Sequence, residues 1–107
     1  MRTVRRVAMF VLLQIASAAP AFAGEVVHVK ISDLAFTPAE ITVRVGDIVE
    51  WVNDDFIDHT ATATAADWDV MVRTGQSAQL QLTKAGMFDY FCRFHPNMTG
   101  KIRVTGK

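Results

Sequence analysis

The sequence predicts an all-β domain, a β-sandwich or barrel, on the basis of three observations. Apolar residues alternate with polar residues in several short segments, which is typical of strands that bury one face. Glycine, aspartate, asparagine and proline separate these segments, and β-branched and aromatic residues are frequent within them. No sustained helical period occurs after residue 23. Many short strands joined by turns indicate packed sheets or a closed barrel.

Three strands are expected in the first half of this domain, over residues 27–31, 41–45 and 48–52, with a turn at Gly46-Asp47 between the last two. Residues 60–74 show the least regular pattern, and we expect them to be irregular with at most a short strand.

Three more strands are expected in the second half, over residues 78–82, 88–92 and 102–104. A turn at Ala85-Gly86 separates the first two of them. Large aromatic side chains in or beside the strands are the candidate core. They are Phe36, Trp51, Phe88 and Tyr90.

The N-terminal stretch has the pattern of a secretory signal peptide. Three arginines occur in residues 1–6, an apolar run follows over residues 7–15, and Ala21-Phe22-Ala23 forms an A-x-A cleavage site. The apolar run is too short to cross a bilayer core of about 30 Å as a helix. We therefore expect residues 1–23 to be removed, and residues 24–107 to form one domain in the periplasm without lasting membrane attachment.

Charge and cysteine content narrow the function. Loss of the three N-terminal arginines leaves 8 basic residues against 11 acidic ones in the exported chain. No basic patch remains that would bind nucleic acid. Cys92 is the only cysteine, so an internal disulfide is excluded. Its thiol is then a partner in an intermolecular disulfide, a reactive nucleophile or a metal ligand.

A cluster of metal-binding residue types lies near the C-terminus. Cys92, His95 and Met98 follow the spacing C-x-x-H-x-x-M at the end of a predicted strand. Thiolate and thioether favour Cu(I), imidazole suits both oxidation states, and two His with one Cys and a weak axial Met form a blue-copper site. The second His must come from elsewhere. His28 lies mid-strand on the solvated face, so His59, at the end of the loop after the Trp51 strand, is the better candidate.

The run from Cys92 to Met98 resembles the ligand loop of the cupredoxins, and its spacing with Pro96 resembles amicyanin most. Residues 36–43, 45–53 and 86–92 resemble strands of the plastocyanin and amicyanin group, so the resemblance covers nearly all of the exported chain.

This resemblance implies a Greek-key β-sandwich with one type 1 copper ion at one end. His59 and His95 would bind copper through imidazole nitrogens, Cys92 as the thiolate and Met98 as the long axial ligand. The protein would shuttle single electrons between redox partners, through an apolar surface around His95. Amicyanin-like partners are a dehydrogenase such as methylamine dehydrogenase as donor and a cytochrome c as acceptor. We expect a monomer.

Two positions depart from the family pattern. Thr60 stands where members carry an asparagine that braces the Cys loop, and a hydroxyl can make part of that bond. Asp58 stands where amicyanins have a proline, and with Asp54 and Asp55 it makes the loop acidic. Such a loop either steers basic partners or is a solvated loop without a partner role.

Three other functions compete with the electron carrier. A copper carrier or buffering protein would use a similar ligand set but exchange its metal. A thiol enzyme would use Cys92 with His95 or His59 as base, but the sequence shows no orienting carboxylate near His95. A copper enzyme would need further histidines for a second copper. We therefore expect no enzymatic activity.

Overall fold

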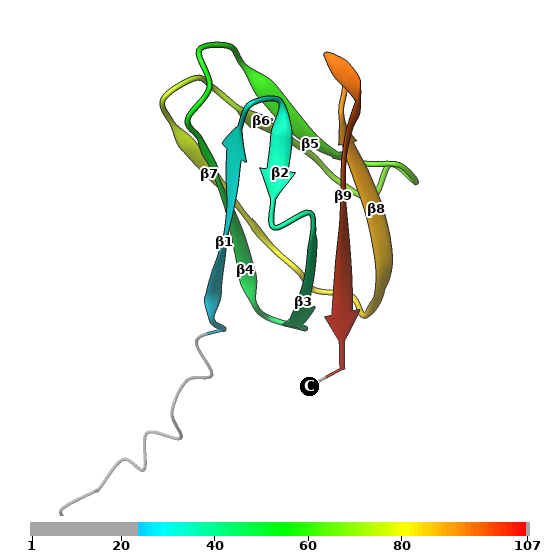
Figure 1. The fold of residues 1–107 in the computed structure, drawn as a ribbon. Helices are drawn as coiled ribbons and strands as arrows, with labels where there is room; N and C mark the ends of the chain where they lie inside the picture. The colour runs from blue at the N-terminus through cyan, green and yellow to red at the C-terminus, as the bar shows by residue number, and fades with distance from the viewer. Residues whose placement is uncertain (1–23, 107) are drawn as a thin grey trace, which may run out of the picture.

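A computed structural model describes residues 24–106 of the chain. The predicted signal peptide, residues 1–23, lies outside the described residues. Within the described part, the strands form two sheets that face each other, and the predicted all-β sandwich is confirmed (Figure 1). No helix in the described part is long and apolar enough to cross a membrane.

The first sheet has four strands in the order β2-β1-β4-β7. β1 and β4 are parallel, with Val29 opposite Trp51, and the other two pairs are antiparallel. The strands are β1 (Val26–Ser32), β2 (Ala35–Thr37), β4 (Ile48–Asn53) and β7 (Ser77–Gln81).

The second sheet has five strands in the order β3-β9-β8-β5-β6. β3 and β9 are parallel, and the remaining pairs are antiparallel. The strands are β3 (Glu40–Arg44), β5 (His59–Ala63), β6 (Asp69–Val72), β8 (Gly86–Cys92) and β9 (His95–Thr105).

The expectation that residues 60–74 are irregular is wrong. β5 and β6 form an antiparallel pair in this region, from His59 opposite Val72 to Thr62 opposite Asp69. The alternation is absent because β5 buries both of its faces: Thr60 and Ala61 are neighbours, and each is fully buried. Polar residues that are buried on a strand give no period-two signal in hydropathy.

The core lies between the sheets and contains the predicted aromatic residues. Phe36, Trp51 and Tyr90 are buried, and Phe88 packs against the core while partly exposed. The Trp51 indole N–H donates to the Tyr90 hydroxyl at 3.3 Å, and burial raises the pKa of Tyr90 to about 12 despite that bond. Tyr90 and Cys92 share the inner face of β8, so the core supports the cysteine directly.

The functional residues gather at one end of the sandwich. β8 ends at Cys92, β9 begins at His95, and β5 begins at His59. In Figure 1 the β8–β9 connection and the loop that leads into β5 lie at the top, and the C-terminus lies at the bottom. Loops at the end of a rigid sandwich are where side chains are commonly presented for function.

Candidate metal centre

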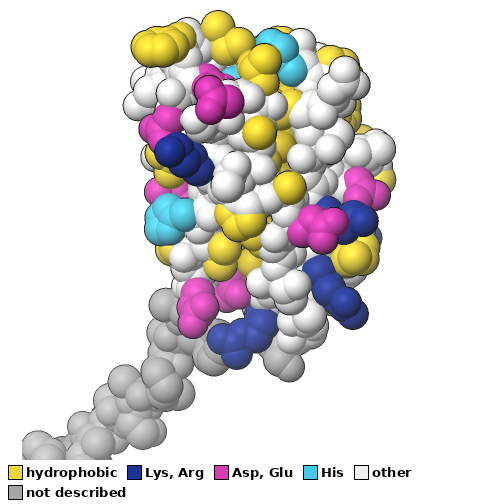
Figure 2. Space-filling view, in the orientation of Figure 1, with side chains coloured by type: hydrophobic (Ala, Val, Ile, Leu, Met, Phe, Trp, Pro, Cys, Tyr) yellow, Lys and Arg dark blue, Asp and Glu magenta, His cyan; other side chains and the backbone are white. Residues whose placement is uncertain are grey.

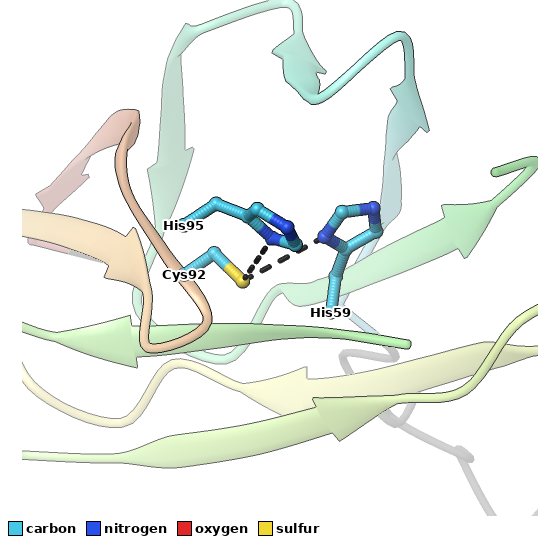
Figure 3. A group of neighbouring side chains, drawn as sticks. All are labelled: His59, Cys92 and His95. Atoms are coloured by element: carbon cyan, nitrogen blue, oxygen red, sulfur yellow. Dashed lines mark hydrogen bonds between the residues drawn. The ribbon is translucent and has the colours of Figure 1, made fainter. Parts of the chain in front are cut away.

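Three of the predicted site residues meet at this end. Nδ1 of His59 lies 3.6 Å from Sγ of Cys92, and Nδ1 of His95 lies 3.7 Å from the same sulfur (Figure 3). One ligand atom from each of the three side chains lies within 4.8 Å of the others. His59 and Cys92 are fully buried, whereas His95 is partly exposed.

Local strand geometry explains this convergence. A register shift between Phe91 and Cys92 marks an irregularity in the β8–β9 pair, and a two-residue turn then places His95 opposite Cys92. β5 pairs with β8 through Thr62 and Phe91, which brings the start of β5 beside the end of β8. The loop between β8 and β9 therefore consists of Arg93 and Phe94 alone, and it is shorter than the ligand loop from Cys92 to Met98 that the sequence suggested.

Met98 lies inside β9 rather than in a loop. Its side chain is buried in the same core cluster as Cys92. The structure thus places the fourth predicted residue in the core cluster that also contains Cys92.

The donor separations of 3.6 and 3.7 Å suit ligands that share one metal ion. A metal with bonds of about 2.3 Å to sulfur and about 2.0 Å to nitrogen, at trigonal angles, would separate those donors by about 3.7 Å. One thiolate, two imidazoles and a thioether are the donor set that copper prefers.

Thr60 braces the site as the departure from the family pattern suggested. Its backbone N–H donates to Cys92 Sγ at 3.4 Å, and its hydroxyl accepts from the Arg93 backbone N–H at 2.9 Å. The same hydroxyl is hydrogen-bonded to the Thr62 hydroxyl at 2.9 Å, and the Thr62 hydroxyl donates to the Asp69 carboxylate at 2.6 Å. Asp69 also accepts from the Arg93 side chain at 3.2 Å, which closes a ring tying β5 to the β8–β9 turn. Hydrogen bonds from Thr62 and then Arg93 lower the pKa of Asp69.

Asp55 contacts the site, a role that was not predicted from the sequence. Its Oδ2 lies 2.8 Å from His59 Nε2, and its carboxylate also accepts the backbone N–H groups of Asp33 and Leu34. Burial raises the pKa of Asp55, but the hydrogen bonds from Leu34, His59 and Asp33 together outweigh it and hold the pKa below its usual value. The only signal in the sequence is an acid four residues before a candidate ligand.

The other acids of this loop lie beside bases. Asp54 lies 3.8 Å from Lys30, and Asp58 lies 3.7 Å from Arg73. The loop is therefore not a uniformly negative surface, and the steering interpretation loses support relative to a structural one.

His28 lies outside the site, as predicted. Its side chain is 63% exposed on β1 and lies 3.3 Å from Glu50. It is a solvated strand residue.

Exposed apolar side chains lie on segments near the metal-binding end. They come from the β1–β2 turn, the β4–β5 loop, β6 and the β8–β9 turn, and Figure 2 shows hydrophobic side chains gathered near a histidine at the top. We call this group the apolar end. Its members are Leu34, Phe56, Ile57, Met71 and Phe94.

Comparisons with known proteins agree with this geometry. The family model of the cupredoxin-like domain matches residues 5–104. Amicyanin of Paracoccus denitrificans is 34% identical over an alignment of 100 positions, which covers 84% of this chain and 76% of that protein. Chloroplastic plastocyanin of Tetradesmus obliquus is 28% identical over an alignment of 121 positions, which covers 95% of this chain and 83% of that protein.

Solved structures show the same relationship. The reduced Cu(I) form of an amicyanin variant matches with a TM-score of 0.68 and 31% identity, over 79% of this chain and 87% of that chain. A two-sheet sandwich that buries a Cys–His–His cluster at one end is the architecture of a cupredoxin. This chain belongs to the cupredoxin-like family, and within it to the group of the plastocyanins and amicyanins.

Proposed function

We propose that the protein is a blue copper electron carrier that holds one copper ion with His59, Cys92, His95 and Met98. The observation that carries this proposal is the convergence of two imidazole Nδ1 atoms on the Cys92 sulfur, at 3.6 and 3.7 Å. Kinship with amicyanins and plastocyanins supports an electron carrier rather than an enzyme.

Copper bound in this site would take up and release one electron. The chain's part is to hold its ligands in one arrangement for both oxidation states. Cys92 and His59 are fully buried, which excludes water from them. The bonds from Thr60 to Cys92 and to the β8–β9 turn keep the ligand-bearing elements together, so little has to move when the charge changes.

Electrons would enter and leave through His95, the partly exposed histidine, within the apolar end. The proposed partners are redox proteins that dock there, specifically a dehydrogenase as electron donor and a cytochrome c as acceptor. The protein would bind each of them as a monomer. We also propose export to the periplasm with removal of residues 1–23, on the basis of the N-terminal sequence pattern.

The test is copper loading of residues 24–107. We expect tight binding of one copper, an intense blue band in the oxidised protein, the small copper hyperfine splitting of a type 1 site by EPR, and reversible bleaching by a reductant. A colourless oxidised protein would contradict the proposal. Ready loss of copper to a chelator, without the blue band, would favour a copper carrier instead.

Placing a charge on the apolar end should slow electron exchange between copies of the protein. Phe56 is 100% exposed in the loop that leads to His59. Phe56→Glu therefore places like charges opposite each other when the apolar ends of two copies meet. We expect the self-exchange rate between Cu(I) and Cu(II) copies, measured by NMR line broadening, to fall about tenfold and to recover partly in high salt.

The matched control is Met87→Glu. Met87 is 60% exposed near the start of β8, at the opposite end of that strand from Cys92, so its substitution should leave the rate nearly unchanged. Equal slowing by both variants would point to net charge rather than docking at the apolar end. No slowing in Phe56→Glu would place the exchange contact elsewhere.

A further inference from the structure

The buried His59 ring is held from both sides. Nδ1 faces Cys92 Sγ at 3.6 Å, while Nε2 lies 2.8 Å from Asp55 Oδ2. An ionised carboxylate only accepts hydrogen bonds, so this contact requires a proton on His59 Nε2. Nδ1 of a neutral His59 then carries its lone pair on the side of Cys92 Sγ, where copper would be held. Asp55 therefore selects the tautomer that can bind a metal.

Asp55 is itself fixed by backbone groups from another part of the chain. Its Oδ1 accepts the Asp33 N–H at 2.8 Å, and its Oδ2 accepts the Leu34 N–H at 3.1 Å. Asp33 and Leu34 have φ of 53° and 58°, a left-handed conformation that is uncommon for leucine. The unusual turn thus directs two consecutive N–H groups at one carboxylate, in charge-assisted bonds.

The backbone of Asp55 is held as well. Its N–H donates to the Asn53 side-chain oxygen at 2.9 Å, and its carbonyl accepts the Thr74 hydroxyl. The carboxyl side chain is 14% exposed, whereas that of the neighbouring Asp54 is 52% exposed. A negative charge that is shielded from water acts on a nearby site more strongly than one in solvent.

We propose that Asp55 is a positioning residue that locks the His59 ring for copper and lowers the reduction potential of the site. This inference rests on the proposed copper function. Its charge lies behind a ligand, so it favours Cu(II), which carries one more positive charge than Cu(I). The hydrogen bond to Nε2 also increases the donor strength of Nδ1, which favours the same oxidation state.

The test compares Asp55→Asn with Asp54→Asn, which removes the same charge one residue away at the surface. We expect Asp55→Asn to lower the ratio of Cu(II) affinity to Cu(I) affinity about tenfold, which is a rise of about 59 mV in midpoint potential for one electron. Asp54→Asn should change it far less. Equal potentials for wild type and Asp55→Asn, or equal shifts in both variants, would overturn the inference.

A second measurement needs neither copper nor a variant. Nitrogen NMR of the metal-free protein should show the His59 proton on Nε2, and Asp55→Ala should lose that preference. A proton on Nδ1 in the wild type would overturn the inference even if Asp55 variants fail to fold. If the wild type bound no copper, the proposed function would fail while this measurement still tested Asp55. A blue wild type with an unshifted Asp55→Asn potential would refute only the role of Asp55.

Discussion

Replacing Cys92 by alanine is expected to abolish the blue absorption and to weaken Cu(II) binding by more than about a hundredfold. Cys92 is the only cysteine, and its sulfur is the atom on which both imidazole Nδ1 atoms converge. Without the thiolate, two neutral imidazoles and a thioether remain, and nothing in that set compensates the charge of Cu(II). The intense colour also requires a bond between copper and thiolate sulfur, which no other residue can supply.

The measurement is a Cu(II) titration followed by visible absorption and EPR. Cys92→Ala removes one sulfur atom from the core and leaves the buried Thr60 N–H without its partner, which together should cost about 2–4 kcal/mol in the metal-free protein, so unfolding curves show whether the fold is kept. His28→Ala is the matched control, because it removes an exposed histidine outside the site and should leave both colour and affinity intact. A Cys92→Ala protein that stayed blue would disprove the ligand assignment.

Replacing Asn53 by alanine should lower the stability of the domain more than any substitution in the loop between β4 and His59. Asn53 is fully buried, and its side-chain amide donates to the backbone carbonyls of Ile57 and Val72 at 2.9 and 3.0 Å. Its side-chain oxygen accepts the backbone N–H of Asp55 at 2.9 Å. Each buried or partly buried backbone group left without a partner costs about 1–3 kcal/mol.

We expect Asn53→Ala to lower the free energy of unfolding by about 3–5 kcal/mol, a large share of the 5–15 kcal/mol typical of a domain. Denaturant unfolding of the metal-free protein measures this loss. Copper affinity should fall as well, because Asp55 and His59 lose the anchor of their loop. Asn97→Ala is the control, since Asn97, the other asparagine of the chain, is exposed. Equal stability of the two variants would mean that the loop does not depend on Asn53.

Strands with a regularly alternating sequence could be predicted, and β5, which buries both of its faces, could not. In β1 the side chains of Val29 and Ile31 are fully buried between more exposed neighbours, and apolar residues alternate with polar ones there in the sequence. In β5 a histidine and a threonine are buried at the metal-binding end, so polarity does not report burial there. The sequence therefore did not predict β5 because the site buries polar residues in this strand.

The candidate ligands could be proposed from residue types and spacing, but their surroundings could not. Cys92, His95 and Met98 are close in sequence, and His59 was the better of two remaining histidines. The structure brings His59, Cys92 and His95 together and buries Met98 in the adjoining core. The ion pairs of Asp54 and Asp58 were not foreseen, because their partners Lys30 and Arg73 come from distant segments.

Local periodicity and short spacings in the sequence suffice to predict the all-β class, the C-x-x-H-x-x-M run at a strand end and the resemblance to cupredoxins. The contact of Asp55 with His59, and the bonds of Thr60 to Cys92 and to the β8–β9 turn, appear only in the folded chain. They could not be predicted because they join residues across sheet registers and turns. A hydrogen bond of 2.8 Å needs its two atoms placed by the whole fold, which no local pattern encodes.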